Sequence, residues 1–209
     1  MRVYVVGTQY GYARWIDNCE LVDKIEDAQV VFFTGGGDVS PKYYGCAQHP
    51  ATWPSTYRDE EEIEIFQQVA DNQLVWGTCR GFQLMAVMNG ALLIQDVTNH
   101  VGTHDITNGE ENYRVTSIHH QMIYPWNLDP KDYDILYWST RKISKHYEGD
   151  KIDPSKVLVE PEVVIFHKEG KPLCFGAQGH PEMMLKEDPF VRKLNIMLQE
   201  YVERVSNIS

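Results

Sequence analysis

Residues 74–83 read LVWGTCRGFQ, and this stretch decides the fold. An apolar run leads into a turn with glycine at positions 77 and 81, and an apolar amphipathic segment, 82–87, follows. The pattern predicts a strand, a very tight turn and a helix. This arrangement is called a nucleophile elbow, with Cys79 here at the position where serine is usual. Glycine is needed on both sides of the turn because the strand and the helix nearly touch there.

Cys79 would lie at the N-terminus of this helix. The partial positive charge of a helix N-terminus favours ionisation of a thiol, and the thiolate is the form that acts as a nucleophile. We therefore predict that Cys79 is a catalytic nucleophile. A buried structural cysteine in a glycine-rich turn is the alternative interpretation of the stretch, and the remaining motifs of the chain favour the nucleophile.

The composition is that of an ordinary folded chain. It has 209 residues, a formal net charge of −11, 43% hydrophobic residues and 23% charged residues. The length suits a single α/β domain over residues 1–209. The acidic balance makes a nucleic acid or an anionic membrane surface an unfavourable partner. We expect no membrane span, because no apolar run reaches the roughly 18 residues that a transmembrane helix needs.

The cysteines and the first residues indicate the compartment. The four cysteines, at positions 19, 46, 79 and 174, show no CxxC spacing. This pattern predicts reduced thiols rather than a disulfide framework or a zinc site. The first residues lack the hydrophobic region of a signal peptide, and we therefore expect a cytoplasmic protein.

Two apolar segments before the elbow, 2–7 and 28–33, predict buried parallel strands. The second runs into TGGGDVSP at 34–41. Glycines at the carboxyl end of a parallel strand let backbone N–H groups approach a ligand, and ligands bind at that edge of open α/β sheets. A phosphate loop is disfavoured because no GK[ST] follows; a plain glycine turn, braced by Asp38 and Ser40, is the other alternative.

Three segments around these strands have less specific patterns. Residues 8–18 carry several aromatic residues and predict a short helix or an aromatic loop over a pocket, with plain packing in the core and at its rim the favoured interpretation of the aromatic side chains. Residues 42–57, rich in Pro, Tyr and Trp, predict an irregular lid. Residues 58–72 predict a helix, whose acidic run at 59–62 fits a solvated first turn next to the helix dipole. Arg58 at the start of this helix could reach the site.

The elbow helix should end at Asn89-Gly90, which is a C-cap signal. Residues 91–97 predict a short strand or an extended arm. His100 and His104 are four residues apart, a spacing that puts two metal ligands on one face only in a helix. Because the intervening glycine and threonine argue against a helix, we expect no metal site there.

The second half of the chain is mostly strand until its last helix. A terminal amphipathic helix over residues 188–205 should cover the sheet. Alternating and apolar runs, with a hairpin turn signal at Glu169-Gly170, predict the remaining strands, of which the last three form a β-meander: 113–117, 135–139, 157–159, 163–167 and 173–178.

Two polar clusters follow predicted strands. Residues 117–121 read SIHHQ and could line a substrate pocket or simply satisfy a turn. Residues 179–182 read GHPE. In extended chain His180 and Glu182 point the same way, and Pro181 fixes the link between them. A base and the carboxylate that orients it and stabilises its imidazolium can therefore come from one segment; a surface histidine beside a helix-capping glutamate is the alternative.

The GGGD loop, the GTCRGFQ elbow and the GHPE segment, in this order, resemble the class I (triad) glutamine amidotransferase superfamily. Within it, TGGGDVSPKYYG, NGALLIQD, SIHHQ and GAQGHPE are most similar to the γ-glutamyl-γ-aminobutyrate hydrolase branch, which consists of stand-alone hydrolases. The resemblance covers nearly the whole chain. It implies an α/β fold of three αβα layers, flavodoxin-like, with a central mostly parallel sheet and a small antiparallel β extension.

The resemblance also implies roles for individual residues. Cys79 would be the nucleophile, His180 the general base and acid, and Glu182 its orienting carboxylate. The oxyanion donors would be backbone N–H groups of Gly36, Gly37 and Arg80. Substrate contacts would come from Gln83 at the γ-glutamyl moiety and from the 117–121 segment at the amino-acid end, namely Ser117, Ile118 and His119. No metal and no organic cofactor is implied.

Two positions depart from the superfamily pattern. Thr34 stands where proline is common, which should be harmless because only the glycine backbone that follows is needed. Gly179 stands where relatives often carry an aromatic residue, so we expect a more open pocket wall beside His180.

The implied reaction is hydrolysis of the γ-glutamyl amide bond of glutamine or of a γ-glutamyl compound. It proceeds through a γ-glutamyl thioester and releases glutamate with ammonia or an amine. One alternative is a glutaminase subunit that supplies ammonia to a separate synthase, which would have to be a partner protein. A second alternative is a non-catalytic relative that binds a ligand or a partner.

Overall fold

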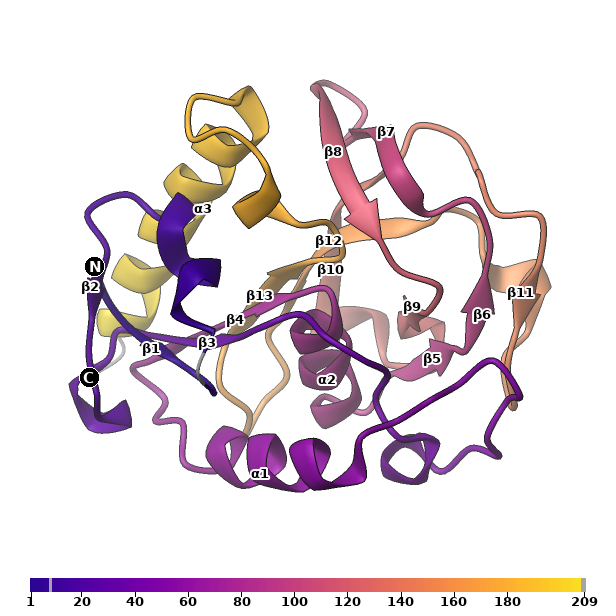
Figure 1. The fold of residues 1–209 in the computed structure, drawn as a ribbon, viewed down its shortest axis with the longest axis horizontal. Helices are drawn as coiled ribbons and strands as arrows, with labels where there is room; N and C mark the ends of the chain where they lie inside the picture. The colour runs from indigo at the N-terminus through magenta and orange to yellow at the C-terminus, as the bar shows by residue number, and fades with distance from the viewer. Residues whose placement is uncertain (8, 208–209) are drawn as a thin grey trace.

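The computed structural model describes residues 1–7 and 9–207. A nine-stranded sheet runs through its centre in the order β2-β1-β3-β4-β13-β12-β10-β7-β8 (Figure 1). One half of the sheet is parallel and consists of β1 (Arg2–Val5), β2 (Glu20–Leu21), β3 (Val30–Phe33), β4 (Leu74–Thr78) and β13 (Cys174–Ala177). The same sheet continues in antiparallel pairs through β12 (Pro161–Phe166), β10 (Tyr133–Ser139), β7 (Val101–Thr107) and β8 (Asn112–Ile118).

Short elements complete the chain. Two small antiparallel pairs are formed by β5 (Leu92–Ile94) with β9 (Met122–Tyr124), and by β6 (Asp96–Val97) with β11 (Tyr147–Glu148). The 3-10 turns are η1 (Tyr10–Trp15), η2 (Ile25–Asp27), η3 (Pro41–Tyr44), η4 (Pro125–Asn127), η5 (Pro130–Asp132), η6 (Pro154–Lys156) and η7 (Pro181–Met183).

Helices cover both faces of the sheet (Figure 1). The side chains of a strand alternate between faces. Val31 and Phe33 of β3 therefore pack in the core with α1 (Thr56–Phe66) and α2 (Arg80–Met88), whereas Val30 and Phe32 pack in the core of α3 (Pro189–Ser206). The result is the three-layer α/β fold that the resemblance implies, with a parallel half of the sheet that carries β3, β4 and β13 and an antiparallel half that extends it.

Most predicted elements are confirmed. The strands expected at 2–7, 28–33 and 135–139 correspond to β1, β3 and β10, and the hairpin at the end of the β-meander is the pair of β12 and β13. The terminal helix begins at Pro189, and the Asp188 side chain caps it by accepting from the Phe190 N–H at 2.9 Å. The aromatic segment 8–18 contains η1, so the short-helix alternative is correct for its described part, which excludes residue 8.

One predicted strand and one predicted helix end are wrong. No strand forms at 157–159, because the Val157 N–H bonds back to Pro154 and closes η6. The helix expected at 58–72 ends at Phe66. The N–H groups of Gln68 and Val69 bond only three residues back, which tightens the last turn and ends the helix.

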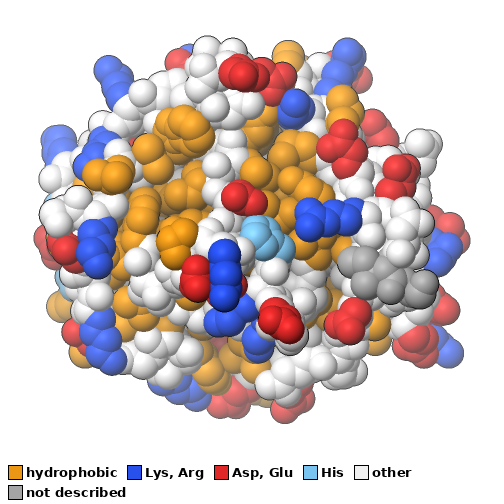
Figure 2. Space-filling view, turned by 180° about the vertical axis from the view of Figure 1, so that it is seen from behind, with side chains coloured by type: hydrophobic (Ala, Val, Ile, Leu, Met, Phe, Trp, Pro, Cys, Tyr) orange, Lys and Arg blue, Asp and Glu red, His pale blue; other side chains and the backbone are white. Residues whose placement is uncertain are grey.

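The surface mixes apolar and charged side chains. On the face turned away from the viewer in Figure 1, hydrophobic side chains form a broad area, and acidic, basic and histidine side chains lie at the centre of this face as well as around its rim (Figure 2). Apolar atoms contribute more than half of the surface of an average folded protein, so exposed apolar area is expected. No helix within residues 1–7 and 9–207 is at once long enough and apolar enough to cross a membrane.

Candidate active site

The site lies at the carboxyl ends of three adjacent parallel strands. β4 is hydrogen-bonded to β3 on one side and to β13 on the other, and these strands lead into the glycine loop, Cys79 and His180. Cys79 has φ 50° and ψ −108° and is the N-cap of α2. A positive φ is uncommon for a residue other than glycine, and such strained conformations concentrate at functional sites.

The elbow has no room for a side chain at Gly77 or Gly81. A Cβ added to Gly77 would lie 2.6 Å from the amide nitrogen of Phe82, and one added to Gly81 would lie 2.5 Å from the carbonyl carbon of Phe33. Both contacts are with backbone, which cannot move aside as a flexible side chain does. β4, α2 and β3 therefore approach one another as closely as the sequence pattern predicts.

His180 and Glu182 form a buried pair. Nδ1 of His180 lies 2.6 Å from Oε1 of Glu182, and the two residues are 5% and 6% exposed. The expected reason for their meeting, an extended segment, is wrong: His180 is the N-cap of η7 and Glu182 lies inside that turn. Arg14, a residue that no sequence motif indicated, donates from η1 to the Glu182 carbonyl and holds this turn in place.

The surroundings of His180 favour its imidazolium form. Burial opposes the charge, but the interactions of the ring with the Cys79 sulfur and with the Glu182 carboxylate outweigh burial and raise the pKa of His180 to about 10. Nε2, the ring nitrogen that does not contact Glu182, is buried and has no hydrogen-bond partner among the described residues. The free nitrogen is therefore available to Cys79 or to a reacting group.

The glycine loop lies between His180 and Arg80. A Cβ on Gly35 would be 3.2 Å from Cε1 of His180 and 2.9 Å from the Tyr12 hydroxyl, and a Cβ on Gly36 would be 3.5 Å from Cδ of Arg80 and overlap Arg58. Side chains thus press on the loop from both sides. Tyr12, from the aromatic segment, belongs to this site, and burial together with the charges of Glu182 and Cys79 raises its pKa.

A buried ion network holds the glycine loop and the elbow together. Arg80 is 1% exposed and pairs with Asp59, at 2.5 Å between Nη2 and Oδ1, and with Glu62. Arg58 pairs with Glu62 at 2.7 Å and donates to the carbonyl and the hydroxyl of Thr34. The Ser40 N–H donates to Asp59 at 2.9 Å. α1 is therefore tied to both ends of the 34–40 loop.

The prediction of a solvated acidic turn at 59–62 is wrong for two of its four residues. Asp59 and Glu62 are 0% and 3% exposed, because residues three apart share a helix face and this face packs on the start of α2. Burial raises the pKa of Asp59, against the opposing effect of Arg80. An arginine placed directly after Cys79, between apolar segments, was the sequence signal for buried acidic partners.

The predicted substrate-binding residues lie around this centre, mostly buried. Nε2 of Gln83 donates to the Gln121 carbonyl at 2.9 Å, and Ser117 is fully buried. Ile118 is half exposed, and its carbonyl oxygen lies 3.8 Å from Sγ of Cys79. Nδ1 of His119 lies 2.8 Å from the Gln121 carbonyl. Of the four, Ile118 is the residue in contact with the sulfur.

The wall beside His180 is closed rather than open. A Cβ on Gly179 would lie 3.0 Å from the Thr116 carbonyl, and the His180 N–H donates to that same carbonyl at 2.8 Å. Strand β8 occupies the space that an aromatic side chain would need. The expectation of an open wall is therefore wrong.

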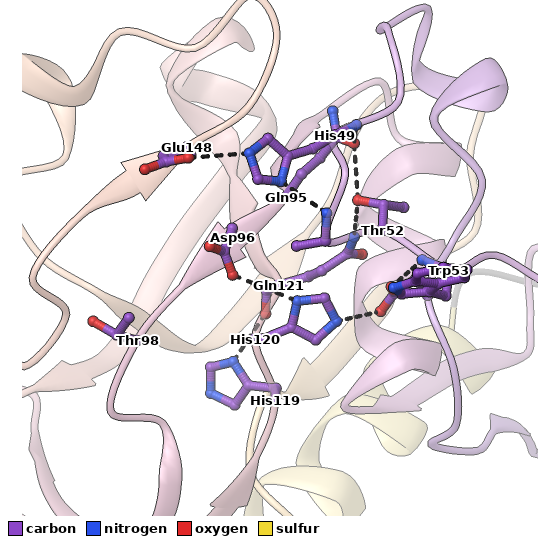
Figure 3. A network of polar contacts seen from close by, with 12 residues as sticks. His49, Thr52, Trp53, Gln95, Asp96, Thr98, His119, His120, Gln121 and Glu148 are labelled. Carbon is purple, nitrogen blue, oxygen red and sulfur yellow. Dashed lines mark hydrogen bonds and ion pairs between the residues drawn. The ribbon is translucent and has the colours of Figure 1, made fainter.

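The 42–57 segment is irregular between η3 and α1, as predicted except for its two helical ends, and it is anchored through polar side chains (Figure 3). The Thr52 hydroxyl accepts from Gln121 and donates to Gln95, both at 3.0 Å. The Trp53 N–H donates to Asp38 at 2.8 Å, while the Trp53 residue is 79% exposed. This network joins the segment to the glycine loop and to the SIHHQ turn.

His120 lies between two carboxylates in the same network (Figure 3). Nε2 is 2.9 Å from Asp38, and Nδ1 is 3.8 Å from Asp96. The hydrogen bond to Asp38 is the main cause that raises the pKa of His120. Asp38 braces the loop, as expected, but through segments far away in the sequence.

The sequence model of the Peptidase C26 family matches residues 16–124, just over half of the chain. The glutamine amidotransferase-like protein YvdE homologue of Lactococcus lactis subsp. cremoris is 34% identical over 49% of this chain and 64% of its own length. The match thus spans less than two thirds of the curated relatives.

Solved structures share the fold. A Thermoplasma acidophilum protein that is described as part of a GMP synthase has a TM-score of 0.63 at 16% identity, over 100% of this chain and 96% of its own. A glutamine amidotransferase of Thermotoga maritima has a TM-score of 0.54 at 15% identity, over 100% and 92%. At these identities the likeness establishes the class I glutamine amidotransferase fold.

Proposed function

Because the chain belongs to the Peptidase C26 family, we propose that it hydrolyses γ-glutamyl amide bonds with a Cys79–His180–Glu182 triad. One observation carries the proposal. Cys79, in a strained elbow, follows β4, and His180, whose Nδ1 lies 2.6 Å from a Glu182 oxygen, follows the adjacent parallel strand β13. This arrangement supplies a nucleophile, a proton carrier and an orienting group within one small volume.

The first step is attack by the Cys79 sulfur on the side-chain amide carbon of the substrate. The imidazolium of His180 stabilises the thiolate, and the start of α2 adds partial positive charge. The new S–C bond forms as the carbonyl electron pair moves onto oxygen. Glu182 fixes the ring so that its protonated Nδ1 points away from the sulfur and Nε2 serves the reaction.

The oxyanion is stabilised by backbone N–H groups. Arg80 is the first residue of α2, so its N–H has no partner inside the helix. Gly36 and Gly37 supply the other donors from the loop that Arg58 and Arg80 hold in place. Loss of one such donor typically lowers the rate by about 10²–10³.

The thioester forms and is then hydrolysed. His180 gives its proton to the leaving nitrogen as the C–N bond breaks, which releases ammonia or an amine. The neutral ring then takes a proton from water, which attacks the thioester carbon. The C–S bond breaks, glutamate leaves, and the thiolate–imidazolium pair is restored.

The substrate is proposed from the branch that the motifs resemble, that of γ-glutamyl-γ-aminobutyrate hydrolases. The Ile118 carbonyl beside the sulfur is placed to accept from the amino-acid end of the γ-glutamyl group. Gln83 and His119 both contact the Gln121 carbonyl and so hold this turn in place. Supply of ammonia to a synthase is the second candidate, favoured by the structural likeness to the Thermoplasma acidophilum protein described as part of a GMP synthase.

The test is steady-state release of glutamate and of amine by the purified chain, with glutamine and a panel of γ-glutamyl amides. Cys79→Ala should abolish turnover, and Cys19→Ala, a half-buried cysteine outside the site, is the matched control. Turnover of a γ-glutamyl amide faster than glutamine supports the stand-alone hydrolase. Glutaminase activity that needs an added synthase supports the second candidate. Undiminished activity in Cys79→Ala refutes the triad, and an inert Cys79 points to a non-catalytic relative.

A further inference from the structure

A second buried polar cluster lies behind the SIHHQ turn. It consists of His100 just before β7, His119 just after β8, and Glu162 on β12. The three residues are 1%, 7% and 1% exposed. One nitrogen or oxygen atom from each lies within 4.8 Å of the others. Three segments far apart in the sequence thus bring two imidazoles and one carboxylate to a single point inside the protein.

Four polar atoms around this point have no hydrogen-bond partners among the described residues. Within the described part of the chain, both ring nitrogens of His100, Nε2 of His119 and Oε2 of Glu162 are buried without a hydrogen-bond partner. Buried polar atoms almost always have partners in folded proteins, and each exception requires an explanation. Four of the thirteen such atoms in the described residues gather around this point, and one ligand bound there would contact an atom of each of the three residues.

The opposite side of each residue is held by a neighbour. Nδ1 of His119 lies 2.8 Å from the Gln121 carbonyl, so it carries the proton and leaves the Nε2 lone pair free (Figure 3). Oε1 of Glu162 lies 2.7 Å from Nε2 of His104 and accepts from Ser139 at 3.1 Å, which leaves Oε2 free. Supporting contacts of this kind orient the ligands of metal ions in proteins.

His100 has the corresponding contact with a second carboxylate. Its Nε2 lies 3.6 Å from Oε1 of Glu160, and its Nδ1 lies 3.9 Å from Oε1 of Glu162. Glu160 is itself fully buried and accepts from the N–H groups of Ile143 and Ser144. Two buried carboxylates therefore lie beside the cluster, and a divalent cation would balance both charges.

We propose that His100, His119 and Glu162 bind a divalent transition-metal ion, with Zn²⁺ the best fit to two imidazoles and one carboxylate. The ion would join β7, β8 and β12 and fix the strand end that carries Ile118 beside the catalytic sulfur. The proposal does not depend on the reaction proposed above. It revises the expectation of no metal, which was based on the His100–His104 spacing, and gives His104 a supporting role.

The probe is Zn²⁺ at a buffered free concentration, and the background is the Cys79→Ala chain, so that the reactive thiol cannot hold the ion. After dialysis, metal analysis should find one zinc per chain. At a free concentration about a hundredfold above Kd, the Tm should rise by about 5–10 °C. Cobalt in place of zinc should give visible absorption bands, a measurement that needs no variant of the ligands.

Two ligand variants and one control locate the ion. Glu162→Gln and His100→Gln should each lose the bound zinc and the rise in Tm. A second possible group, His49 with Asp96 and Glu148, lies nearer the surface. His49→Gln removes a ligand from that group and should keep the bound zinc and the rise in Tm.

Three outcomes would overturn the proposal. One is a stoichiometry well below one zinc per chain together with an unchanged Tm, as expected if water or protons on the histidines fill the cluster. Another is zinc retained in both ligand variants. The third is zinc lost in His49→Gln alone, which would place the ion at the second group.

Discussion

Glu62→Gln should destabilise the protein strongly although Glu62 lies outside the proposed triad. Its two oxygens pair with different cations: Oε1 with Arg58 at 2.7 Å and Oε2 with Arg80. An amide of the same size leaves both guanidinium groups with one remaining carboxylate, that of Asp59. Breaking a buried ion pair costs about 3–5 kcal/mol. We use about 3 kcal/mol because the Arg58 side chain is a quarter exposed. Since each kcal/mol lowers the Tm of a chain of this size by about 2–4 °C, the Tm of Glu62→Gln should fall by about 6–12 °C.

The assay is calorimetric unfolding of Glu62→Gln beside Glu64→Gln, an exposed glutamate on the same helix that serves as the matched control. The control should change stability by less than about 0.5 kcal/mol. Because Arg58 anchors the glycine loop, kcat/KM for a γ-glutamyl amide should also fall, by about ten- to a hundredfold, through misplaced oxyanion donors. Equal Tm values for the two variants would refute the reasoning that the network is buried and paired.

Three further predictions follow from the packing and the pKa values. Gly81→Ala should prevent stable folding, because its Cβ meets backbone of β3, whereas Gly11→Ala, with open space around it, should unfold normally by circular dichroism. In Glu182→Gln the alkaline limb of kcat/KM should move down by at least about one pH unit from the His180 pKa of about 10. The raised pKa of His180 contributes to the free energy of unfolding fully below about pH 6.5, and this contribution is lost as the pH rises through about 10. The difference in free energy of unfolding between the original chain and Glu182→Gln, measured by urea titration, should therefore shrink over that pH range. A difference that stays constant contradicts the raised pKa of His180. Burial raises the pKa of Cys174 to about 12, so peptide mapping should find it unalkylated by iodoacetamide at neutral pH until urea is added.

The parts of the fold that could be predicted are those encoded within one short segment. The elbow at 74–83 has its strand, turn and helix in ten consecutive residues, and the hairpin of β12 and β13 has its turn signal between the two strands. The N-cap at Asp188 is likewise local. In each case the residues that form the contact are neighbours in the sequence, so pattern alone specifies the geometry.

The parts that could not be predicted depend on which distant segments meet. Asp59 and Glu62 have the pattern of a solvated helix turn, and only the packing of α1 on α2 brings them to Arg80. His100, just before β7, has no such neighbour close to it in the sequence, and only the folding of distant segments brings His119 and Glu162 near it. Two expectations, a single domain over residues 1–209 and a cytoplasmic location, stay predictions.

The strand order has a consequence for synthesis of the chain. β13 fills the place between β4 and β12, and both of these strands precede it in the sequence. Until β13 emerges from the ribosome, the sheet consists of two separate halves, each with an open edge. His180 follows Cys79 by about a hundred residues, which is roughly 5–20 s of translation. The newly made chain therefore carries the Cys79 thiol for seconds without His180, and the last strand both closes the sheet and completes the proposed catalytic centre.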